Sequence, residues 1–311
     1  MQYTSLLFVS LLWGSSFVLI RTASHEVTAY ALAMDRTVVA GAFLLTLATI
    51  RGVSPPVGVS IWRRLFLLSL VGQICPFVLL AIAGHLTSSV NLAFMMGTAP
   101  LATFVMSAVV PPKEEWSGMT LAGLALGACG VAISFHAPRA NIASATGSSA
   151  LNMLGQLAAF GAAVSYAGGA LVSRDLSAKI DSFAVVTYSM CLSAILMVLC
   201  AFFQHVIVHD PVVLPHSFLT IMTLLILGIF NTGIAYAVYF RLIHQAGATF
   251  AGLNNYLVPP IGVIFGGIIL HESISPTIWL SLALVLIGVV LVRTSQLIIR
   301  SRNTTSNLSA N

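Results

Sequence analysis

Charged residues are scarce in this chain, which has only 13 Lys or Arg and 8 Asp or Glu among its 311 residues. A soluble domain carries about 25% charged residues, whereas here 7% are charged and 58% are hydrophobic. This composition excludes a water-soluble globule. At roughly 20 apolar residues per membrane-spanning helix, the chain can form about nine or ten spans. We therefore expect an all-α polytopic membrane protein, a multi-pass chain without a separate soluble domain.

Motifs that define several other classes of protein are also absent. There is no GxxxxGK(S/T) loop, so an NTP-driven motor that uses this phosphate-binding loop is not expected. The basic residues are scattered, with no cluster longer than Arg63-Arg64, which is not a nucleic-acid-binding footprint. The apolar runs contain no HExxH motif, paired carboxylates or Ser/His combination, as an intramembrane enzyme would need. The sequence predicts no catalytic residues and no nucleic-acid partner.

The residues that commonly bind metals are not clustered. The cysteines lie inside apolar stretches without CxxC spacing, and we interpret them as buried thiols: Cys75, Cys129, Cys191 and Cys200. His205 and His209 have the i, i+4 spacing of a metal-binding pair on a helix. No third ligand lies close to them in sequence, which favours loop or interfacial imidazoles. We predict neither a metal site nor a cofactor.

Apolar runs separated by polar segments predict ten transmembrane helices, at about 4–22, 28–50, 63–84, 87–110, 117–135, 150–172, 182–203, 217–240, 249–270 and 276–296. The first run begins close to Met1 and has neither a basic leading segment nor a small-residue cleavage site before the second run. We expect it to remain as the first helix rather than to be removed as a signal peptide.

The distribution of Lys and Arg predicts the orientation, because cytoplasmic loops carry an excess of these residues. With the N-terminus inside, Arg21 and Arg139 lie outside and Arg36 lies within a span. The other basic residues all fall on the cytoplasmic side: Arg51, Arg63, Arg64, Lys113, Arg174, Lys179, Arg241, Arg293, Arg300 and Arg302. Both termini are therefore predicted to be cytoplasmic (N-in/C-in).

The two sides of the polar linker at 136–149 show a weak internal repeat. Features that recur in the same order pair Ser16-Phe17 with Ser165-Tyr166, Pro100 with Pro259, Glu114 with Glu272, and Gly130 with Gly288. Five spans per half is an odd number, so the second copy must enter the membrane from the opposite side. Inverted repeats are the architecture of alternating-access transport. We expect repeats at 1–135 and 150–296, an external linker at 136–149, and a cytoplasmic tail at 297–311.

Short motifs spread over nearly the whole chain resemble one known family. They are Leu12 to Phe17, Arg36, Asn91-Leu92-Ala93 through Ala99-Pro100-Leu101, Pro111 to Glu115, Gly155-Gln156-Leu157 through Ala163 to Tyr166, Ala235-Tyr236, Val258-Pro259-Pro260 and His271-Glu272. In this order, and with the five-plus-five layout, they resemble the EamA-type members of the drug/metabolite transporter (DMT) superfamily. Ala162 departs from the pattern, because it stands where the repeat places the partner of Trp13.

The resemblance implies a secondary transporter that exports or exchanges small organic metabolites, often amino acids, across the bacterial inner membrane. Its partners would be a small-molecule substrate and the lipid bilayer. The alternatives are a proton-coupled efflux carrier for drugs or toxic compounds and a membrane protein that does not transport. Asp35 is the only acidic residue deep within a span. Proton-driven carriers commonly use such a residue, but cationic or polar groups from another helix could hold the Asp35 carboxylate ionised, so that it would not titrate near neutral pH. Because no other deep acid is present, we favour a facilitator or exchanger over proton antiport.

Arg36 is the residue whose position most needs an explanation. An arginine near the centre of a membrane helix costs about 2.5–3.5 kcal/mol on insertion scales. Its guanidinium could line a cavity and bind a substrate carboxylate or a polar group of the facing repeat. It could equally extend outward toward the membrane surface or pin two helices together. The sequence leaves these alternatives open.

Other deep polar and aromatic residues concentrate in spans 1, 3, 4, 6, 8 and 9, which we expect to surround a central cavity. The amides could also be hydrogen bonds between helices, and the aromatic residues could face lipid or pack between helices. The predicted substrate-binding residues are Trp13, Ser16, Arg36, Gln73, Asn91, Met95, Gln156, Tyr166, Asn231, Tyr236, Asn254 and Asn255.

Proline and glycine positions predict bends and close helix packing. Pro100, Pro259 and Pro260 lie within apolar spans, where proline kinks a helix. We assign them a gating role, with a plain structural bend as the alternative. Gly123-x-x-x-Gly127 and Gly262-x-x-x-Gly266 predict close packing, either within the chain or in a homodimer.

Overall fold

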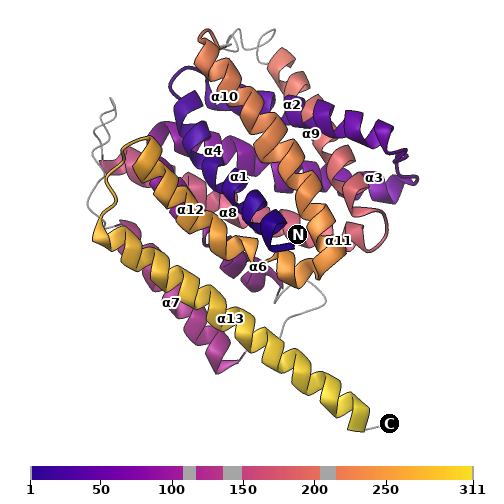
Figure 1. The fold of residues 1–311 in the computed structure, drawn as a ribbon, viewed down its shortest axis with the longest axis vertical. Coiled ribbons are helices and arrows are strands. Elements are labelled where there is room, and N and C mark those ends of the chain that lie inside the picture. Colours follow the sequence, from indigo (N-terminus) through magenta and orange to yellow (C-terminus); the bar gives the residue numbers. More distant parts are fainter. Residues whose placement is uncertain (1, 108–116, 136–148, 204–214, 310–311) are drawn as a thin grey trace.

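The computed structural model describes residues 2–107, 117–135, 149–203 and 215–309, and its regular secondary structure in these ranges is helical throughout. Helices are expected here because a backbone in hydrocarbon must satisfy its N–H and C=O groups internally. Figure 1 shows the helices packed as one bundle, with the C-terminal end of α13 projecting beyond it. The bundle therefore has the all-α architecture that the composition predicts.

The first half of the chain follows the predicted spans with two interruptions. Its elements are α1 (Gln2–Ala23), α2 (Ala29–Ile50), α3 (Val59–Ser69), η1 (Leu70–Ile74), α4 (Cys75–Leu86), α5 (Ser89–Met96), α6 (Ala99–Ser107) and α7 (Gly118–Phe135). The third span contains the π-helical segment η1 between α3 and α4. The fourth span is broken at Gly97 and Thr98, which separate α5 from α6.

The second half contains α8 (Ser149–Ser177), α9 (Ser182–Phe203), α10 (Phe218–Gly228), the π-helical η3 (Ile229–Ile234), α11 (Ala235–Ala251), α12 (Asn254–Ile269) and α13 (Pro276–Ser309). Two helices extend furthest past their predicted ends. α11 continues past the expected end at 240, and α13 continues through most of the expected tail at 297–311. Hydropathy does not mark these ends, because a helix can leave the apolar layer without breaking.

The span count depends on α12. In the described part of the chain, nine helices are long and apolar enough to cross a membrane by length and composition. The predicted span at 249–270 forms only the 16-residue α12, since α11 includes the residues up to Ala251. The prediction of a multi-pass chain is thus confirmed, while the tenth span and the orientation stay predictions.

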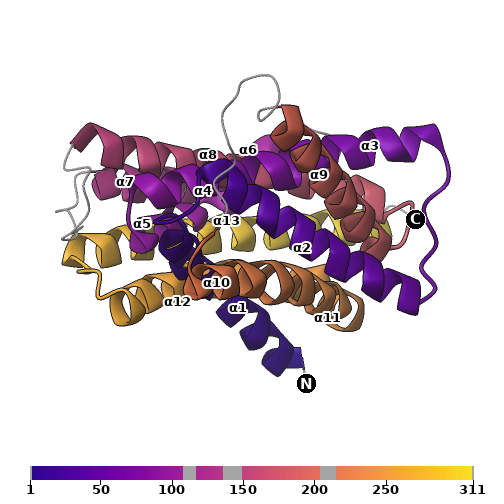
Figure 2. The same ribbon diagram turned by 90° about the horizontal axis from the view of Figure 1, so that it is seen from above.

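Helices of the two halves pack against one another in a reciprocal pattern. Figure 2 shows the bundle from above. α1 packs on α12, and α8 packs on both α5 and α6. α4 packs on α8, and α11 packs on α1. The remaining major contacts join α2 with α9, α5 with α12, and α7 with α13. Exchange of the halves turns the contact of α1 with α12 into that of α8 with α5 and α6, and the contact of α4 with α8 into that of α11 with α1. The other three contacts each join two corresponding helices.

The backbones of α7 and α13 approach closely where glycine leaves room. A Cβ atom added to Gly123 would lie 2.6 Å from the carbonyl oxygen of Gly288, and one added to Gly130 would lie 2.8 Å from that of Ser281. Figure 1 shows the two helices side by side along one edge of the molecule. This glycine face is therefore occupied within the chain.

The second predicted glycine face is also occupied within the chain. A Cβ atom at Gly262 would lie 2.6 Å from Ala93 Cβ, and one at Gly266 would lie 2.5 Å from Ser89 Oγ. Both contacts join α12 to α5. A homodimer stays a prediction that neither face requires.

The interpretation of the cysteines as buried thiols is wrong for three of them. Cys75, Cys129 and Cys200 are exposed, while Cys191 is half-buried. An apolar run indicates that a residue lies within the membrane, but it does not indicate whether the side chain faces lipid or another helix. All four thiols are free.

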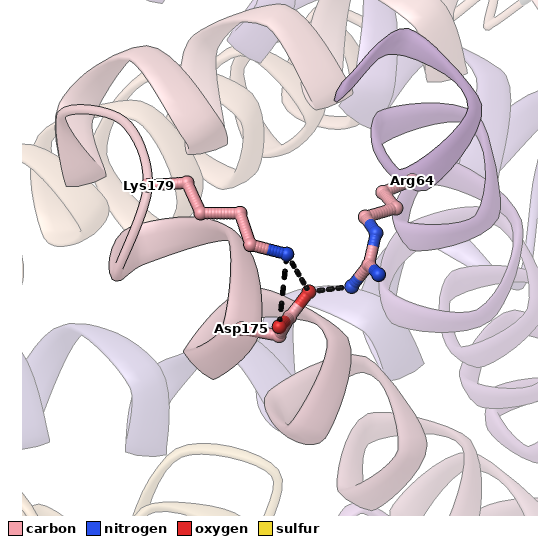
Figure 3. A network of polar contacts seen from close by, with 3 residues as sticks. All are labelled: Arg64, Asp175 and Lys179. Atoms are coloured by element: carbon pink, nitrogen blue, oxygen red, sulfur yellow. Dashed lines mark hydrogen bonds and ion pairs between the residues drawn. The ribbon is translucent and has the colours of Figure 1, made fainter. Parts of the chain in front are cut away.

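An ion-pair network joins the two halves near the ends of α3 and α8. Arg64 forms an ion pair with Asp175, and Lys179 donates hydrogen bonds of 3.2 Å to both carboxylate oxygens of Asp175 (Figure 3). These side chains are partly exposed, and surface ion pairs contribute only about 0–1 kcal/mol. The network therefore adds little stability, and its basic residues lie on the side predicted to be cytoplasmic.

We expect Gly123→Ala to destabilise the protein by roughly 1–3 kcal/mol, because the added methyl group would collide with the backbone of α13. Gly118→Ala is the matched control on the same helix, since nothing lies within 4 Å of a Cβ atom there. Thermal unfolding in detergent compares the two variants. Equal melting temperatures for both variants would contradict this account of the α7–α13 contact.

The predicted orientation can be tested with single cysteines at exposed positions, in a chain from which the native cysteines have been removed. Ser54 and Ala178 are predicted to be cytoplasmic, and His25 and His271 external. An impermeant maleimide added to intact cells should label cysteines at His25 and His271 only. Labelling of all four positions, or of the opposite pair, would refute the orientation.

Candidate functional site

A cavity of about 270 Å³ lies between helices from both halves of the chain. Six of the contributing spans are those expected from the sequence, and α2 adds Arg36. The lining residues are Trp13, Ser16, Phe17, Arg36, Leu80, Met96, Ala99, Pro100, Thr103, Tyr166, Ala167, Ala170, Tyr236, Tyr239, Asn254, Asn255, Val258 and Pro259. Most of these side chains are apolar or aromatic, as is usual for a small-molecule pocket.

Arg36 is 5% exposed and is held from two directions. Its Nε donates a 2.9 Å hydrogen bond to Thr232 Oγ1, and its Cζ lies 4.0 Å from the centroid of the Phe77 ring. Thr232 in turn donates to the carbonyl of Leu227 at 2.9 Å. Since Thr232 belongs to η3 and Phe77 to α4, the guanidinium links the two halves. No carboxylate in the described residues forms an ion pair with it.

Aromatic rings form one wall of the cavity. The ring of Trp13 packs edge-on against that of Tyr236 and tilted against that of Tyr239, with centroid distances of 5.6 and 5.0 Å. Tyr166, from α8, packs edge-on against Phe77 with a centroid distance of 6.2 Å. Such edge-on pairs hold each ring in a defined orientation. The cavity therefore has rigid walls, and its aromatic residues come from both halves.

Amide and hydroxyl groups supply the neutral polar part of the cavity. Asn254 is 2% exposed, and its Oδ1 accepts a 2.8 Å hydrogen bond from Ser10. No hydrogen bond within the described residues uses its NH₂ group, which leaves two donors for the cavity. Asn255 lies beside it and is exposed. Thus α12 places both amides in its first turn, where they line the cavity.

Five of the predicted substrate-binding residues lie outside the cavity lining. Gln73 bonds Ser189 and Ser193 of α9 at 2.8 and 2.6 Å, so its amide joins two helices. Asn91 donates to Thr87 Oγ1, one turn away on the chain. Both amides have structural partners, and any role in binding stays a prediction.

The other three residues outside the lining are Met95, Gln156 and Asn231. Met95 is fully buried in the apolar core. The Nδ2 of Asn231 donates to the carbonyl of Leu12 and to Ser15 Oγ, so it joins η3 to α1. Gln156 and Asn231 are buried, and each has a side-chain oxygen without a hydrogen-bond partner in the described residues.

The two π-helical segments lie at equivalent positions of the two halves. Gln73 lies in η1 and Asn231 in η3, 158 residues apart, the same offset as between Glu114 and Glu272. π-helical turns within α-helices are frequent at functional sites. The sequence gives no direct signal for them, because the apolar run continues through both segments.

The predicted gating prolines differ in their positions. Pro100 lies in the first turn of α6, just after the break at Gly97 and Thr98. Pro259 and Pro260 lie inside α12, and of these only Pro259 is among the residues that line the cavity. A Cβ atom at Gly97 would lie 3.3 Å from Pro259 Cγ, so the break in one half touches the proline of the other.

Several lining residues are missing from the sequence-based predictions. Tyr239 follows Tyr236 by three residues, and Thr103 follows Pro100 by three, which puts each pair on one helix face. Helical spacing from a predicted residue could have identified both. Met96 lines the cavity where its neighbour Met95 was expected, because consecutive residues point about 100° apart.

One end of the bundle, which holds residues 24–28 and 270–275, is tied together by two carboxylates. The Oε atoms of Glu272 accept 2.9 Å hydrogen bonds from Ser89 N, Ser89 Oγ and Val90 N at the start of α5. Glu26 likewise accepts from the backbone N–H groups of His216 and Ser217 and from the Ser217 hydroxyl. Each glutamate thus caps a helix of the opposite half.

Hydrogen bonds from the Ser217 side chain, helped by Thr220 and by backbone N–H groups, lower the pKa of Glu26 from 4.5 to about 2. A carboxylate with a lowered pKa stays ionised at neutral pH, and its contact is lost only as the pH falls toward 2. The tie between Glu26 and α10 is therefore not a pH switch in the physiological range.

No group of three or more His, Cys, Asp or Glu residues in the described ranges could hold a metal ion. His205 and His209, and the linker at 136–148, lie outside the described residues.

Known proteins similar to this chain include two that are named as transporters and one WAT1-related protein. The chain is 25% identical to the uncharacterized transporter YvbV of Bacillus subtilis over 58% of its length, which covers 55% of that protein. It is 25% identical to the WAT1-related protein At3g02690, chloroplastic, of Arabidopsis thaliana over 94% of this chain and 69% of that one. It is 23% identical to the uncharacterized inner membrane transporter YedA of Escherichia coli K12 over 93% and 90% of the two chains.

The fold also matches a solved crystal structure, with a TM-score of 0.62 and 20% identity over 95% of this chain and 96% of that one. The sequence matches the EamA-like transporter family in two blocks, at residues 2–136 and 153–294. The resemblance of the motifs to EamA-type members of the drug/metabolite transporter superfamily is thereby confirmed. The chain belongs to the EamA-like transporter family, a family of multi-pass membrane transporters.

Proposed function

We propose that this transporter exchanges or exports small organic metabolites, amino acids or related compounds, by alternating access between two inverted five-helix repeats. The observation that carries the proposal is the cavity, which both halves line and which contains a buried guanidinium, amides and aromatic rings. Secondary transporters place their binding sites between repeats in this way. The site residues proposed are those that line the cavity: Trp13, Ser16, Arg36, Tyr166, Tyr236, Asn254 and Asn255.

Two features support the repeats at 1–135 and 150–296. The major helix contacts between the halves correspond to one another when the halves are exchanged. The π-helical segments recur at the offset that relates Glu114 to Glu272. Because each half has an odd number of predicted spans, the copies would lie inverted in the membrane.

The arrangement of contacts supports an inward-facing state. Glu26 and Glu272 tie the end that is predicted to be external. Ala170 and Asn255 are exposed residues of the cavity lining and lie toward the other end, which is predicted to be cytoplasmic. A carrier in this state would bind or release substrate on the inside. We place it in the bacterial inner membrane, as the name of YedA states for that protein.

Proton-coupled efflux is the second candidate function. Asp35 is half-buried in α2 and forms no hydrogen bond or ion pair with the described residues. It does not line the cavity. Proton coupling needs an acid that is exposed alternately to the two sides, and a position away from the cavity favours exchange or facilitated transport.

Reconstituted protein tests the function directly. Proteoliposomes preloaded with an unlabelled amino-acid mixture should take up labelled amino acids faster than protein-free vesicles, and faster than vesicles that lack the internal load. An imposed pH gradient should leave this uptake unchanged. Concentrative uptake driven by the pH gradient, lost in Asp35→Asn and kept in the exposed Asp175→Asn control, would establish the proton-coupled alternative.

The inward-facing state makes a separate prediction. Glu272→Gln removes the charge at the start of α5, and a charge at a helix N-terminus stabilises by about 0.3–1 kcal/mol. External reagent should therefore label a cysteine at Ser16 roughly two- to fivefold faster in this variant. Asp181→Asn is the control, because Asp181 caps α9 by accepting from Ala184 N at the opposite end of the bundle. An equal increase in both variants would reject the proposed external closure.

A further inference from the structure

The charge of the cavity narrows the class of its substrate. Arg36 is the one charged residue among the described residues that line it. The nearest acid in sequence, Asp35, lies outside the lining. A cation in this cavity would meet one positive charge and no carboxylate, whereas an anion would neutralise the guanidinium.

The guanidinium also has unused donors. Of its five N–H groups, only the one on Nε has a hydrogen bond in the described residues, to Thr232. The Phe77 ring lies 4.0 Å from Cζ and covers a face of the guanidinium, while its Nη donors remain. Two parallel N–H groups on one guanidinium match the two oxygens of a carboxylate. The NH₂ group of Asn254, a lining residue whose Oδ1 accepts from Ser10, supplies further donors.

The size and the walls of the cavity limit the part of the substrate other than its carboxylate. A volume of about 270 Å³ is below the roughly 300–1,000 Å³ of pockets for drug-sized ligands. The walls that line the cavity together with Arg36 are rings and aliphatic side chains, including Trp13, Tyr166 and Leu80. They suit an apolar body of about the size of one aromatic ring.

We propose that the cavity selects a small monocarboxylate with an aromatic or aliphatic body, with its carboxylate on the Nη donors of Arg36 and its body against the aromatic wall. The proposal rests on the proposed transport function, because it assigns a substrate class to the same cavity. It excludes organic cations as preferred substrates, which distinguishes this chain from a carrier for cationic drugs.

A matched set of ligands tests the class on the unmodified protein. The probes are 3-phenylpropionate, its neutral amide 3-phenylpropionamide, and the cation 3-phenylpropylamine, which share one body. Binding to purified protein in detergent is measured by calorimetry. The carboxylate should bind about 10- to 100-fold more tightly than the amide, as expected for hydrogen bonds to a charged group. Binding of the amide or the amine as tightly as the carboxylate would overturn the proposal, as would binding of none of them.

Variants separate binding from folding. Arg36→Gln should reduce the preference for carboxylate over amide to less than threefold, and Arg36→Lys should keep only part of it, because lysine cannot make the bidentate contact. Arg51→Gln is the matched control, since Arg51 also lies over a phenyl ring, that of Phe183 at 4.9 Å, but outside the cavity. An unchanged preference in a folded Arg36 variant would refute the assignment, and so would its loss in Arg51→Gln.

Exchange in proteoliposomes distinguishes failure of the substrate class from failure of the transport function. Counterflow of the amide or the amine, but not of the carboxylate, would show transport of a different class of substrate and would overturn the proposal. Selective binding of the carboxylate to purified protein, with no counterflow of any probe, would support the assigned class and reject the transport function. Counterflow of the carboxylate alone, reduced at least tenfold in Arg36→Gln, is the expected result.

Discussion

The buried charge of Arg36 is the constraint on which the centre of this molecule depends. A charge in a low-dielectric environment needs either water, an opposite charge or several polar partners. Within the described part of the chain, Arg36 contacts one hydroxyl, of Thr232, and one ring, of Phe77, which come from different halves. These two contacts satisfy only part of the guanidinium. The cavity beside it is therefore required physically, because it gives the remaining N–H groups access to solvent or to an anion.

Around this centre, the two halves are joined by contacts of very different strength. At α7 and α13 the backbones touch through glycine, which leaves no freedom for sliding without loss of packing. At the ends of the bundle the contacts are polar and partly exposed: Arg64 with Asp175 at one end, and Glu26 and Glu272 with helix N-termini at the other. Polar contacts at the ends can be exchanged for water at low cost. A fixed peripheral pair and replaceable end contacts are what a rocking motion of two halves needs.

The sequence predicted well at what depth in the membrane a residue lies, but it predicted poorly which way the side chain faces. The apolar runs identified the nine helices of the described chain that are long enough to cross a membrane, and the deep polar residues Arg36 and Asn254 do line the cavity. Gln73 and Asn231 lie at similar depth but bond to Ser189 and to Leu12 instead, since an amide in hydrocarbon takes whichever partner the packing supplies. Hydropathy cannot distinguish these outcomes, because the side toward which a residue points depends on how the helix rotates against its neighbours. The exposed cysteines show the same limit.

The state of the cavity when empty bears on the type of transport. Closing an empty cavity would expel water and leave the guanidinium of Arg36 with only Thr232 and Phe77 as contacts among the described residues. Removal of water from a charge without a partner costs several kcal/mol, whereas a bound carboxylate would provide the opposite charge. Passage of the empty carrier between its two states would therefore be slow, and passage of the loaded carrier would be faster. A carrier that changes between its two states only when loaded is an exchanger. The proposed position of the carboxylate and the proposed exchange mechanism therefore both follow from the buried charge of Arg36.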